Sequence, residues 1–280
     1  MSSNSNDNKV WFITGAARGI GAEIARAALA AGHAVVATGR RLEPLQQVYR
    51  EFGDAVLPLA LDVADEAQAG AAVAAALERF GRIDVLVNNA GYGLLGAFET
   101  LGAPEIEDVF TTNVFGLMHV TRAALPAMRA RRSGHVVNVS SIGGVAGFEG
   151  SSVYCATKFA VTGFSESLAL ELAPAGIAVT VVEPGFIRTD FLDGSSVRYG
   201  TREVPAGVSS ERSYSQYNRQ QPGDPARLAA AVLDLVGREQ PPVHFLAGSD
   251  AVEIASATVA KRQAEVAAWR TLSQSVDGRF

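Results

Sequence analysis

The candidate chemistry of this sequence begins with a tyrosine and a lysine. Tyr154 and Lys158 stand four positions apart, and in a helix that spacing places two side chains on one face, one turn from each other. A phenol with its ordinary pKa of ~10 is a poor acid or base at neutral pH, but a fixed cation beside it favours the phenolate. The pair therefore predicts a proton-transfer device.

A serine upstream could give that device its target. If Ser141 and Tyr154 converge on one oxygen, they can polarise a carbonyl and protonate the alkoxide that forms when hydride arrives. Taken separately, they could be a turn serine and a half-buried aromatic residue whose hydroxyl is in contact with water. Their joint occurrence beside a nucleotide-binding loop favours catalysis.

That loop is the glycine-rich segment 14–21, Thr-Gly-Ala-Ala-Arg-Gly-Ile-Gly, with Ile20 between its last two glycines. It follows a predicted strand and opens a predicted helix, as a phosphate-binding loop must. Gly15 permits the tight turn, Gly19 lets the backbone approach a pyrophosphate, and Gly21 lets the helix pack against the strand. The segment predicts a dinucleotide cofactor.

Two arginines indicate which dinucleotide. An NAD site usually has an acidic residue at the end of the second strand, whereas this chain has Gly39 there, followed by Arg40. Together with Arg18 of the glycine loop, Arg40 could hold a 2′-phosphate by charge-assisted hydrogen bonds. Both could instead be solvated surface arginines. We expect NADP(H) to be favoured over NAD(H).

Weaker polar signals follow other strands. Asp62 and Val63 come just after the third predicted strand, where the aspartate could contact adenine or stand at the N-cap side of the next helix. The run Asn89, Ala90, Gly91 follows the fourth strand and could tie a loop to the sheet while a cofactor lies against its backbone. Asn113 falls within a long predicted helix, where asparagine is a poor former, which indicates a polar role or a kink.

Composition excludes several classes of protein. The 280 residues are 48% hydrophobic and 19% charged, which is ordinary for a compact enzyme, and a net charge of −5 argues against nucleic acid as a partner. The single cysteine, Cys155, and four scattered histidines predict no metal site. A nucleophile elbow of the G-x-S-x-G kind is absent from the sequence.

No segment has the features of a targeting sequence. Residues 1–8 are polar and read as a disordered tail, neither a signal peptide nor an anchor. Apolar runs fall well short of the ~20 residues that cross a membrane. We expect a cytoplasmic protein that does not bind membranes.

Alternating β-branched and alanine-rich stretches predict an α/β fold: a Rossmann-type doubly wound parallel sheet of about seven strands, flanked by helices on both faces. Strands are expected at 10–14, 34–38, 56–60, 83–87, 135–139, 178–182 and 243–246. Helices are expected at 19–31, 42–51, 65–79, 104–131, 151–173, 224–237 and 250–270. One domain should span 9–280.

Two stretches stand out within that domain. Residues 188–222 have no sustained period, and so long a connection after the sixth strand predicts a substrate lid. Aromatic residues that could line a pocket beneath it are Phe148, Phe186, Phe191, Tyr199 and Tyr214. The helix at 151–173 is apolar around most of its circumference, which predicts a subunit interface and a homodimer or homotetramer.

In combination, these motifs resemble the short-chain dehydrogenase/reductase family, in its single-domain NAD(P)-dependent division, over nearly the whole chain. The matching positions are 14–21, Asp62, 88–91, Asn113, Ser141, Tyr154, Lys158, Pro184, Gly185 and Thr189. Segments 89–96 and 153–169 look closest to the 17-beta-hydroxysteroid and retinol dehydrogenase branch.

The resemblance implies a role for each matching residue. Tyr154 would be the general acid/base, Ser141 would hold the substrate oxygen, and Lys158 would bind the nicotinamide ribose and lower the pKa of the phenol. Asn113 would hold a water that feeds protons to Lys158. The residues that would orient the nicotinamide are Pro184, Gly185, Ile187 and Thr189.

The expected activity is NADP(H)-dependent interconversion of an apolar ketone or aldehyde and its alcohol, by an enzyme that acts on CH–OH groups. The alternative is an NADPH-sensing regulator or scaffold on the same fold, because a fold does not decide function. A sensor has no use for an acid with its lysine, which favours the enzyme. Substrate identity, direction, stereochemistry and oligomer size stay open.

Overall fold

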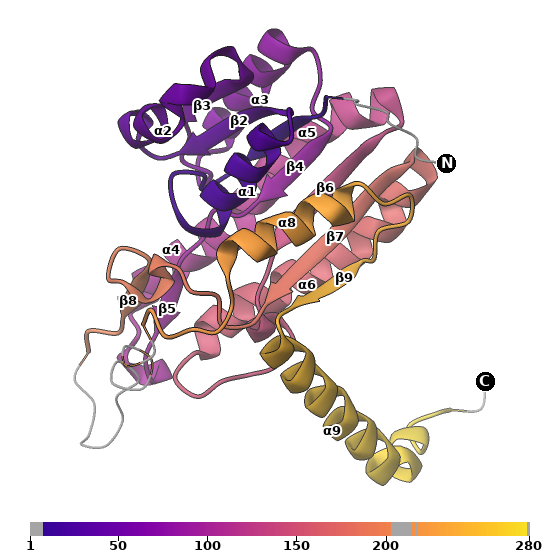
Figure 1. The fold of residues 1–280 in the computed structure, drawn as a ribbon. Helices are drawn as coiled ribbons and strands as arrows, with labels where there is room; N and C mark the ends of the chain where they lie inside the picture. The colour runs from indigo at the N-terminus through magenta and orange to yellow at the C-terminus, as the bar shows by residue number, and fades with distance from the viewer. Residues whose placement is uncertain (1–7, 203–213, 215, 217, 279–280) are drawn as a thin grey trace.

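The computed structural model describes residues 8–202, 214, 216 and 218–278, and its centre is a seven-stranded parallel sheet (Figure 1). The strand order is β3-β2-β1-β4-β6-β7-β9, which confirms the doubly wound Rossmann-type prediction. The strands are β1 (Val10–Ile13), β2 (Ala34–Gly39), β3 (Val56–Ala60), β4 (Val85–Asn88), β6 (Gly134–Val139), β7 (Ile177–Pro184) and β9 (His244–Ala247).

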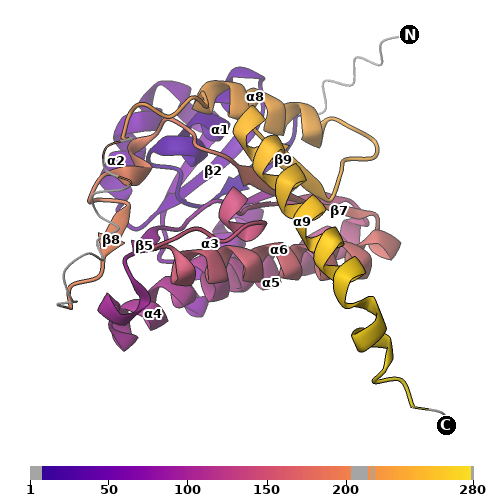
Figure 2. The ribbon, with the colours of Figure 1, turned by 90° about the horizontal axis from the view of Figure 1, so that it is seen from below.

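Helices cover both faces of this sheet, and Figure 2 shows the two layers from below. The core against one face draws on α1, α2 and α8, and the core against the other draws on α3, α5 and α6. The α-helices are α1 (Gly19–Ala30), α2 (Leu42–Tyr49), α3 (Glu66–Phe80), α4 (Ala103–Phe110), α5 (Leu117–Arg131), α6 (Ser152–Leu172), α8 (Pro225–Val236) and α9 (Ser249–Gln274). Short 3₁₀ turns occupy Arg50–Ala55, Phe98–Thr100, Ile142–Gly144, Ala173–Ala175 and Asp190–Leu192.

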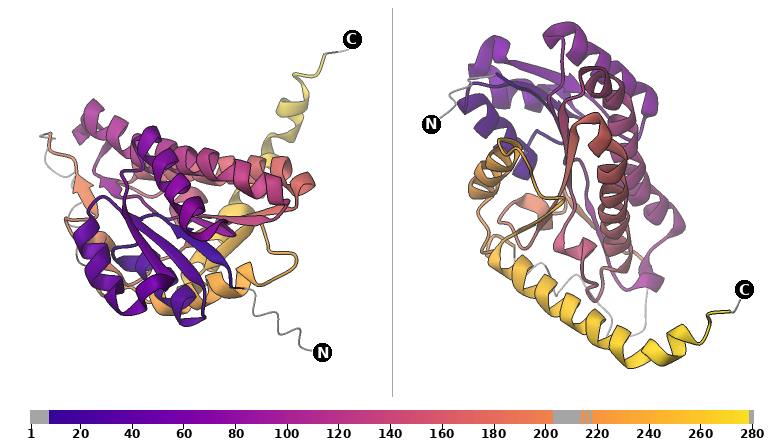
Figure 3. Two further views of the ribbon diagram at one scale, coloured as in Figure 1. Left: turned by 90° about the horizontal axis from the view of Figure 1, so that it is seen from above. Right: turned by 90° about the vertical axis from the view of Figure 1, so that its right-hand side faces the viewer.

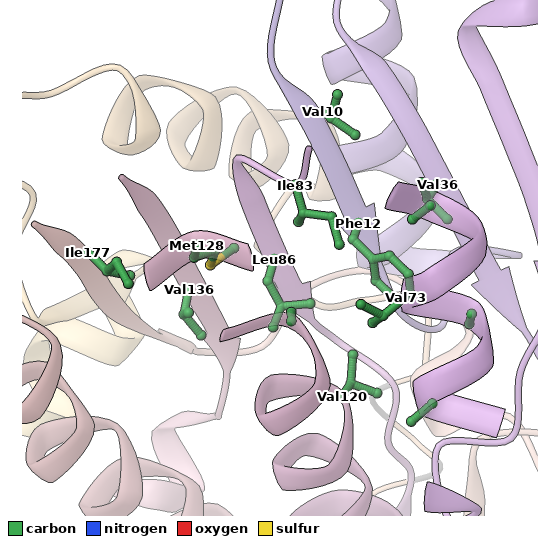
Figure 4. Packing of buried hydrophobic residues seen from close by; sticks show 14 of the residues in the cluster. Val10, Phe12, Val36, Val73, Ile83, Leu86, Val120, Met128, Val136 and Ile177 are labelled. Atoms are coloured by element: carbon green, nitrogen blue, oxygen red, sulfur yellow. The ribbon is translucent and has the colours of Figure 1, made fainter. Parts of the chain in front are cut away.

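Side-chain alternation along β1 explains why the central strands are apolar on both sides. Trp11 and Ile13 enter the core beneath α1, α2 and α8, whereas Val10 and Phe12 enter the core on the opposite face. Figure 4 shows this second core, where Phe12 lies near Val73. Burial on both faces requires the continuous apolar strands that the sequence displays.

The helix predicted over 104–131 is not continuous. It is divided into α4 and α5 by a π-helical turn at Thr111–Gly116, and Asn113 lies inside this turn. The wider turn brings the Asn113 amide to the backbone of Tyr92, which lies just beyond β4. Asn113 therefore has the polar role that was one of the two possibilities for an asparagine in this position, and the helix is interrupted there by a π-helical turn.

A second, two-stranded sheet was not anticipated from the sequence. β5 (Gly93–Leu95) pairs in parallel with β8 (Val197–Tyr199). Each strand has three residues, too few for a recognisable period. The described part of the predicted lid is thus structured and tied to the loop after β4, while residues 203–213, 215 and 217 lie outside the described residues, as do residues 1–7 of the predicted tail.

The last helix, α9, begins beside the sheet and extends away from the rest of the protein (Figures 1 and 3). It continues to Gln274, four residues past its predicted end, and residues 259–278 are all exposed. Among the helices of the described ranges, none has the length and apolar character that crossing a membrane requires.

Candidate active site

A cleft of about 1140 Å³ lies at the carboxyl ends of the parallel strands. It includes the crevice between β1 and β4, where the chain order of the sheet reverses and α/β proteins bind ligands. Its walls come from the glycine loop, the ends of β2, β4, β6 and β7, the first turns of α6 and the segment after β7. Of the nineteen residues expected at the site, all line this cleft except Gly21 and Asn113.

The predicted catalytic residues meet in this cleft. Tyr154 and Lys158 face it from the first turns of α6, and Ser141 faces it from the start of the 3₁₀ turn that follows β6. Lys158 is 7% exposed; its Nζ donates to the Val139 carbonyl oxygen at 3.0 Å and lies 5.8 Å from the centroid of the Tyr154 ring. The Ser141 side chain is hydrogen-bonded to the phenol.

Burial controls the acid–base properties of the pair. It raises the pKa of Tyr154 to about 12, and the hydrogen bond with Ser141 opposes that rise. Burial lowers the pKa of Lys158 to about 8. Desolvation outweighs the other effects on the tyrosine, and the expected lowering of the phenol pKa by Lys158 stays a prediction. A protonated phenol is the form that can donate a proton to a developing alkoxide.

Asn113 lies one layer behind the cleft. Its Oδ1 accepts from the backbone N–H of Tyr92 at 3.0 Å, and its Nδ2 donates to the Tyr92 carbonyl at 2.9 Å and to Thr157 Oγ1 at 3.2 Å. A Cβ on Gly91 would be 3.0 Å from Asn113 Oδ1 and 3.9 Å from Lys158 Nζ. Asn113 therefore shapes the wall beside the lysine, and its part in proton supply stays a prediction.

Two glycines of the loop differ in the space around them: Gly21 is tightly packed against Asn89, whereas Gly19 faces open space in the cleft. A Cβ on Gly21 would lie 2.4 Å from Asn89 Nδ2, an atom that donates to the carbonyls of Thr14 and Gly15 at 3.0 and 3.1 Å. For Gly19, with φ +58°, the one described residue beyond its chain neighbours that comes within 4 Å of such a Cβ is Thr189, across the cleft. The open space beside the Gly19 backbone fits the close approach of a pyrophosphate to the start of α1.

The charged residues around the nucleotide end differ in their partners. Arg40 follows β2 and lines the cleft. Arg18 instead reaches across the cleft to Ser195, donating to its hydroxyl and, at 2.7 Å, to its carbonyl oxygen. The N-cap of α3 is Asp65, not Asp62, which leaves Asp62 in the cleft wall, where it accepts from the Ala64 N–H at 3.1 Å.

The turn after β7 is held by a residue that sequence reasoning missed. Asp250, at the start of α9, accepts a hydrogen bond from the backbone N–H of Phe186 at 2.7 Å, and a Cβ on Gly185 would lie 2.3 Å from its carboxylate. The turn places Pro184, Gly185, Ile187 and Thr189 in the cleft wall. Asp250 is 64 residues from Phe186, so the sequence around it does not indicate this contact. Its place in the first turn of a helix is the one local feature that marks it.

The segment after this turn covers the reacting end of the cleft with apolar side chains. The Phe191 ring lies 5.7 Å from that of Tyr154. Of the five aromatic residues expected here, four line the cleft and Tyr199 does not. Apolar residues that the sequence did not single out are Leu95, Ile142, Leu192 and Val197.

Within the described ranges, no three His, Cys, Asp or Glu residues are grouped so that they could hold a metal ion.

Comparisons with known proteins agree with this arrangement. The model of the short chain dehydrogenase family matches residues 9–198. An oxidoreductase of Botryotinia fuckeliana is 42% identical over 95% of this chain and 98% of its own length. A 3-ketodihydrosphingosine reductase of Bacteroides thetaiotaomicron is 36% identical over 86% of this chain and 88% of its own.

Solved structures show the same fold. A short-chain dehydrogenase from Streptomyces avermitilis is 41% identical with a TM-score of 0.90, covering 98% of this chain and all of its own. A short-chain dehydrogenase/reductase from Burkholderia phymatum in complex with NAD is 27% identical with a TM-score of 0.78, covering 86% of this chain and 89% of its own. A serine dehydrogenase complexed with NADP+ is 30% identical with a TM-score of 0.75, covering 85% and 93%. The chain belongs to the short-chain dehydrogenase/reductase family and is an oxidoreductase that acts on CH–OH groups with a nicotinamide cofactor.

Proposed function

We propose that this protein is an NADP(H)-dependent enzyme that interconverts an apolar ketone or aldehyde and the corresponding alcohol. One observation carries the proposal: the phenol of Tyr154, hydrogen-bonded to Ser141, faces the same cleft as the glycine loop. A proton donor and a nucleotide-binding loop in one cleft are what carbonyl reduction needs. The regulator or scaffold alternative gains no support from the relatives described above, which are named as oxidoreductases, dehydrogenases and a reductase.

In the proposed reaction, a bound nicotinamide would provide the hydride for the carbonyl carbon, and the protein provides the proton. Ser141 donates a hydrogen bond to the substrate oxygen, and Tyr154 transfers its phenolic proton to that oxygen as negative charge develops. Lys158, still mainly an ammonium at pH 7, stabilises the phenolate that remains. In alcohol oxidation, the phenolate accepts the proton.

The preference for NADP(H) rests on the residues after β2. Gly39 stands where an NAD-binding acid is usual, and Arg40 follows it at the edge of the cleft. The contact of Arg18 with Ser195 leaves Arg40 as the main candidate for the 2′-phosphate. Some similar structures contain NAD and others NADP, so they do not favour either cofactor. The proposed preference for NADP(H) therefore rests on the arginines of this chain.

We propose that residues 188–222 form a lid that selects the substrate. Its described part places Phe191, Leu192 and Val197 against the reacting end of the cleft. These side chains favour a substrate with an apolar body around its carbonyl. The similarity to a 3-ketodihydrosphingosine reductase supports a ketone of this kind.

We also propose a homodimer or homotetramer that pairs through α6. Phe159 and Leu170 on this helix are 37% and 78% exposed, and a partner's α6 would cover such side chains. The cysteine on the same helix, Cys155, is free and buried, which fits the reducing cytoplasm that we propose as the location.

The test is a panel of apolar ketones, aldehydes and alcohols with both cofactors, followed by nicotinamide absorbance. We expect NADPH-dependent reduction of at least one apolar carbonyl, with the rate falling ~10²-fold or more in Tyr154→Phe. The Tyr154→Phe protein should still bind NADPH, as measured by nucleotide fluorescence. Turnover that is unchanged in Tyr154→Phe would refute the assigned acid.

A further inference from the structure

A buried carboxylate lies directly beside the cleft without lining it. Glu183 is the residue before Pro184 in β7, and it is 1% exposed. Burial raises the pKa of its carboxyl, and His244 is the leading influence in the opposite direction. A buried acid is costly unless its oxygens have partners, and both oxygens of Glu183 have one.

One of these partners is a histidine between two acids. His244, the first residue of β9, has its Nδ1 3.2 Å from Glu183 Oε2 and its Nε2 3.2 Å from Glu166 Oε1 on α6. A neutral imidazole has one donor nitrogen and one acceptor nitrogen, so only the doubly protonated ring donates to both carboxylates. His244 thus links the buried acid of β7 to an acid of α6.

The other partner of Glu183 is Thr162, which connects it to α6, the helix that carries Tyr154 and Lys158. Thr162 on α6 donates to Glu183 Oε1 at 3.3 Å and lies 3.1 Å from the hydroxyl of Ser140, which donates to the Lys158 carbonyl oxygen at 3.0 Å. A Cβ on Gly144 would be within 2.8 Å of these last three groups: Thr162 Oγ1, Ser140 Oγ and the Lys158 carbonyl. The chain of contacts thus has no room for another side chain.

Three members of this chain of contacts belong to the proposed site or adjoin it in sequence. Ser140 precedes Ser141, Glu183 precedes the Pro184–Gly185 turn, and the Lys158 backbone is itself a member. No member replaces the chemistry of Tyr154 or Lys158. What the chain of contacts can do is fix β6, β7 and α6 relative to one another at the cleft, to the tolerance of a few tenths of an ångström that catalysis demands.

We propose that Glu183 is a positioning residue. With His244 and Thr162, it holds the turn after β7, on the nicotinamide side of the cleft, in a fixed position relative to Ser141 and to α6, the helix that carries Tyr154 and Lys158. This inference rests on the proposed carbonyl reduction. It predicts that neutralising Glu183 disturbs cofactor binding and turnover together, whereas neutralising a buried acid elsewhere disturbs folding alone.

The test compares Glu183→Gln with Asp84→Asn in the full-length protein. Asp84 is also buried, but it precedes β4 at the opposite end of the strands, where it accepts from the Val10 N–H at 2.8 Å and pairs with Arg82 and Arg131. Three quantities are measured for each: the Kd for NADPH by fluorescence, kcat with the best carbonyl of the panel, and Tm.

For Glu183→Gln we expect the Kd for NADPH to rise at least fivefold and kcat to fall at least tenfold. For Asp84→Asn we expect a lower Tm with Kd and kcat within twofold of the wild type. Wild-type values of Kd and kcat in Glu183→Gln would overturn the inference. So would a result in which the rise in Kd and the fall in kcat accompany the fall in Tm to the same extent in both variants.

A second variant keeps the question answerable if Glu183→Gln does not fold. His244→Asn changes a residue whose side chain is 44% exposed and should reproduce a smaller share of both losses. In the double variant Glu183→Gln/His244→Asn, the losses should be less than the product of the single ones, because both act through one contact. If the wild type reduces no carbonyl, the proposed function fails, and the NADPH Kd alone decides whether Glu183 positions the turn.

Discussion

The ammonium of Lys158 and the phenol of Tyr154 lie one turn apart on α6, with Nζ 5.8 Å from the ring centroid. Lys158 is buried and Tyr154 is half-buried, and desolvation moves their pKa values in opposite directions, to about 8 and about 12. At neutral pH the ammonium and the neutral phenol therefore coexist. That combination suits proton donation by the phenol.

The buried lysine should cost stability that a neutral residue recovers. Because the pKa of Lys158 falls from 10.5 to about 8 on folding, the penalty is fully present below pH 8 and fades between pH 8 and 10.5, as the unfolded chain alone holds the extra proton. Lys158→Met should raise the unfolding free energy by roughly 1 to 3 kcal/mol at pH 7, with little gain above pH 10, and should abolish turnover. Urea unfolding at several pH values measures this; a gain that does not depend on pH would contradict the cause.

Arg40 should decide between the two dinucleotides. Arg40→Asp should raise the Kd for NADPH at least tenfold and leave that for NADH within about threefold, because only NADPH carries the 2′-phosphate. Arg41→Asp, at the next residue along the cleft wall, controls for the general effect of charge. If both variants weaken NADPH equally, or if Arg40→Asp weakens both nucleotides alike, the arginine is not the specific contact.

Two glycine-to-alanine changes should have opposite effects. In Gly21→Ala the new methyl would meet Asn89 Nδ2 at 2.4 Å, so we expect a lower Tm and NADPH binding weakened at least tenfold. Gly70 lies in α3, and in the part of the chain that the structure describes no atom outside its own helix backbone comes within 4 Å of its added Cβ. Gly70→Ala should therefore stabilise the protein by ~0.5–1 kcal/mol. Thermal unfolding with nucleotide titration checks both, and a Gly21→Ala protein with wild-type binding would show that Asn89 moves freely.

The proposed α6 interface should break when charge is placed on it. Leu170 is 78% exposed on that helix, so Leu170→Asp should convert the oligomer to a smaller species while preserving the fold of the subunit. Light scattering after size exclusion, with circular dichroism as the folding control, measures the change. Leu170→Ala should keep the oligomer. An unchanged mass for Leu170→Asp would place the interface elsewhere.

Local patterns were enough to predict much of the fold. Two-face burial of strands such as β1 requires continuous apolar runs, and the glycine loop needs its spacing within eight residues. The pair formed by Tyr154 and Lys158 also lies within one helix, so its geometry follows from helical periodicity. These features depend on neighbours along the chain, which a sequence displays directly.

Contacts between distant residues could not be predicted in this way. The β5–β8 sheet joins residues about a hundred positions apart, Asp250 holds a turn 64 residues earlier, and Arg18 meets Ser195. Asp65 rather than Asp62 caps α3, a choice between nearby acids that backbone geometry makes.

The sequence by itself determined the doubly wound sheet, the glycine-rich loop and the polar residue types that face the cleft, because these depend on local periodicity and spacing. Only the tertiary structure decided the direction in which the pKa values of Tyr154 and Lys158 move, since desolvation depends on everything packed around them. It also decided that Glu183 lies beside the site, because parallel strands bring residues together that are far apart in the chain.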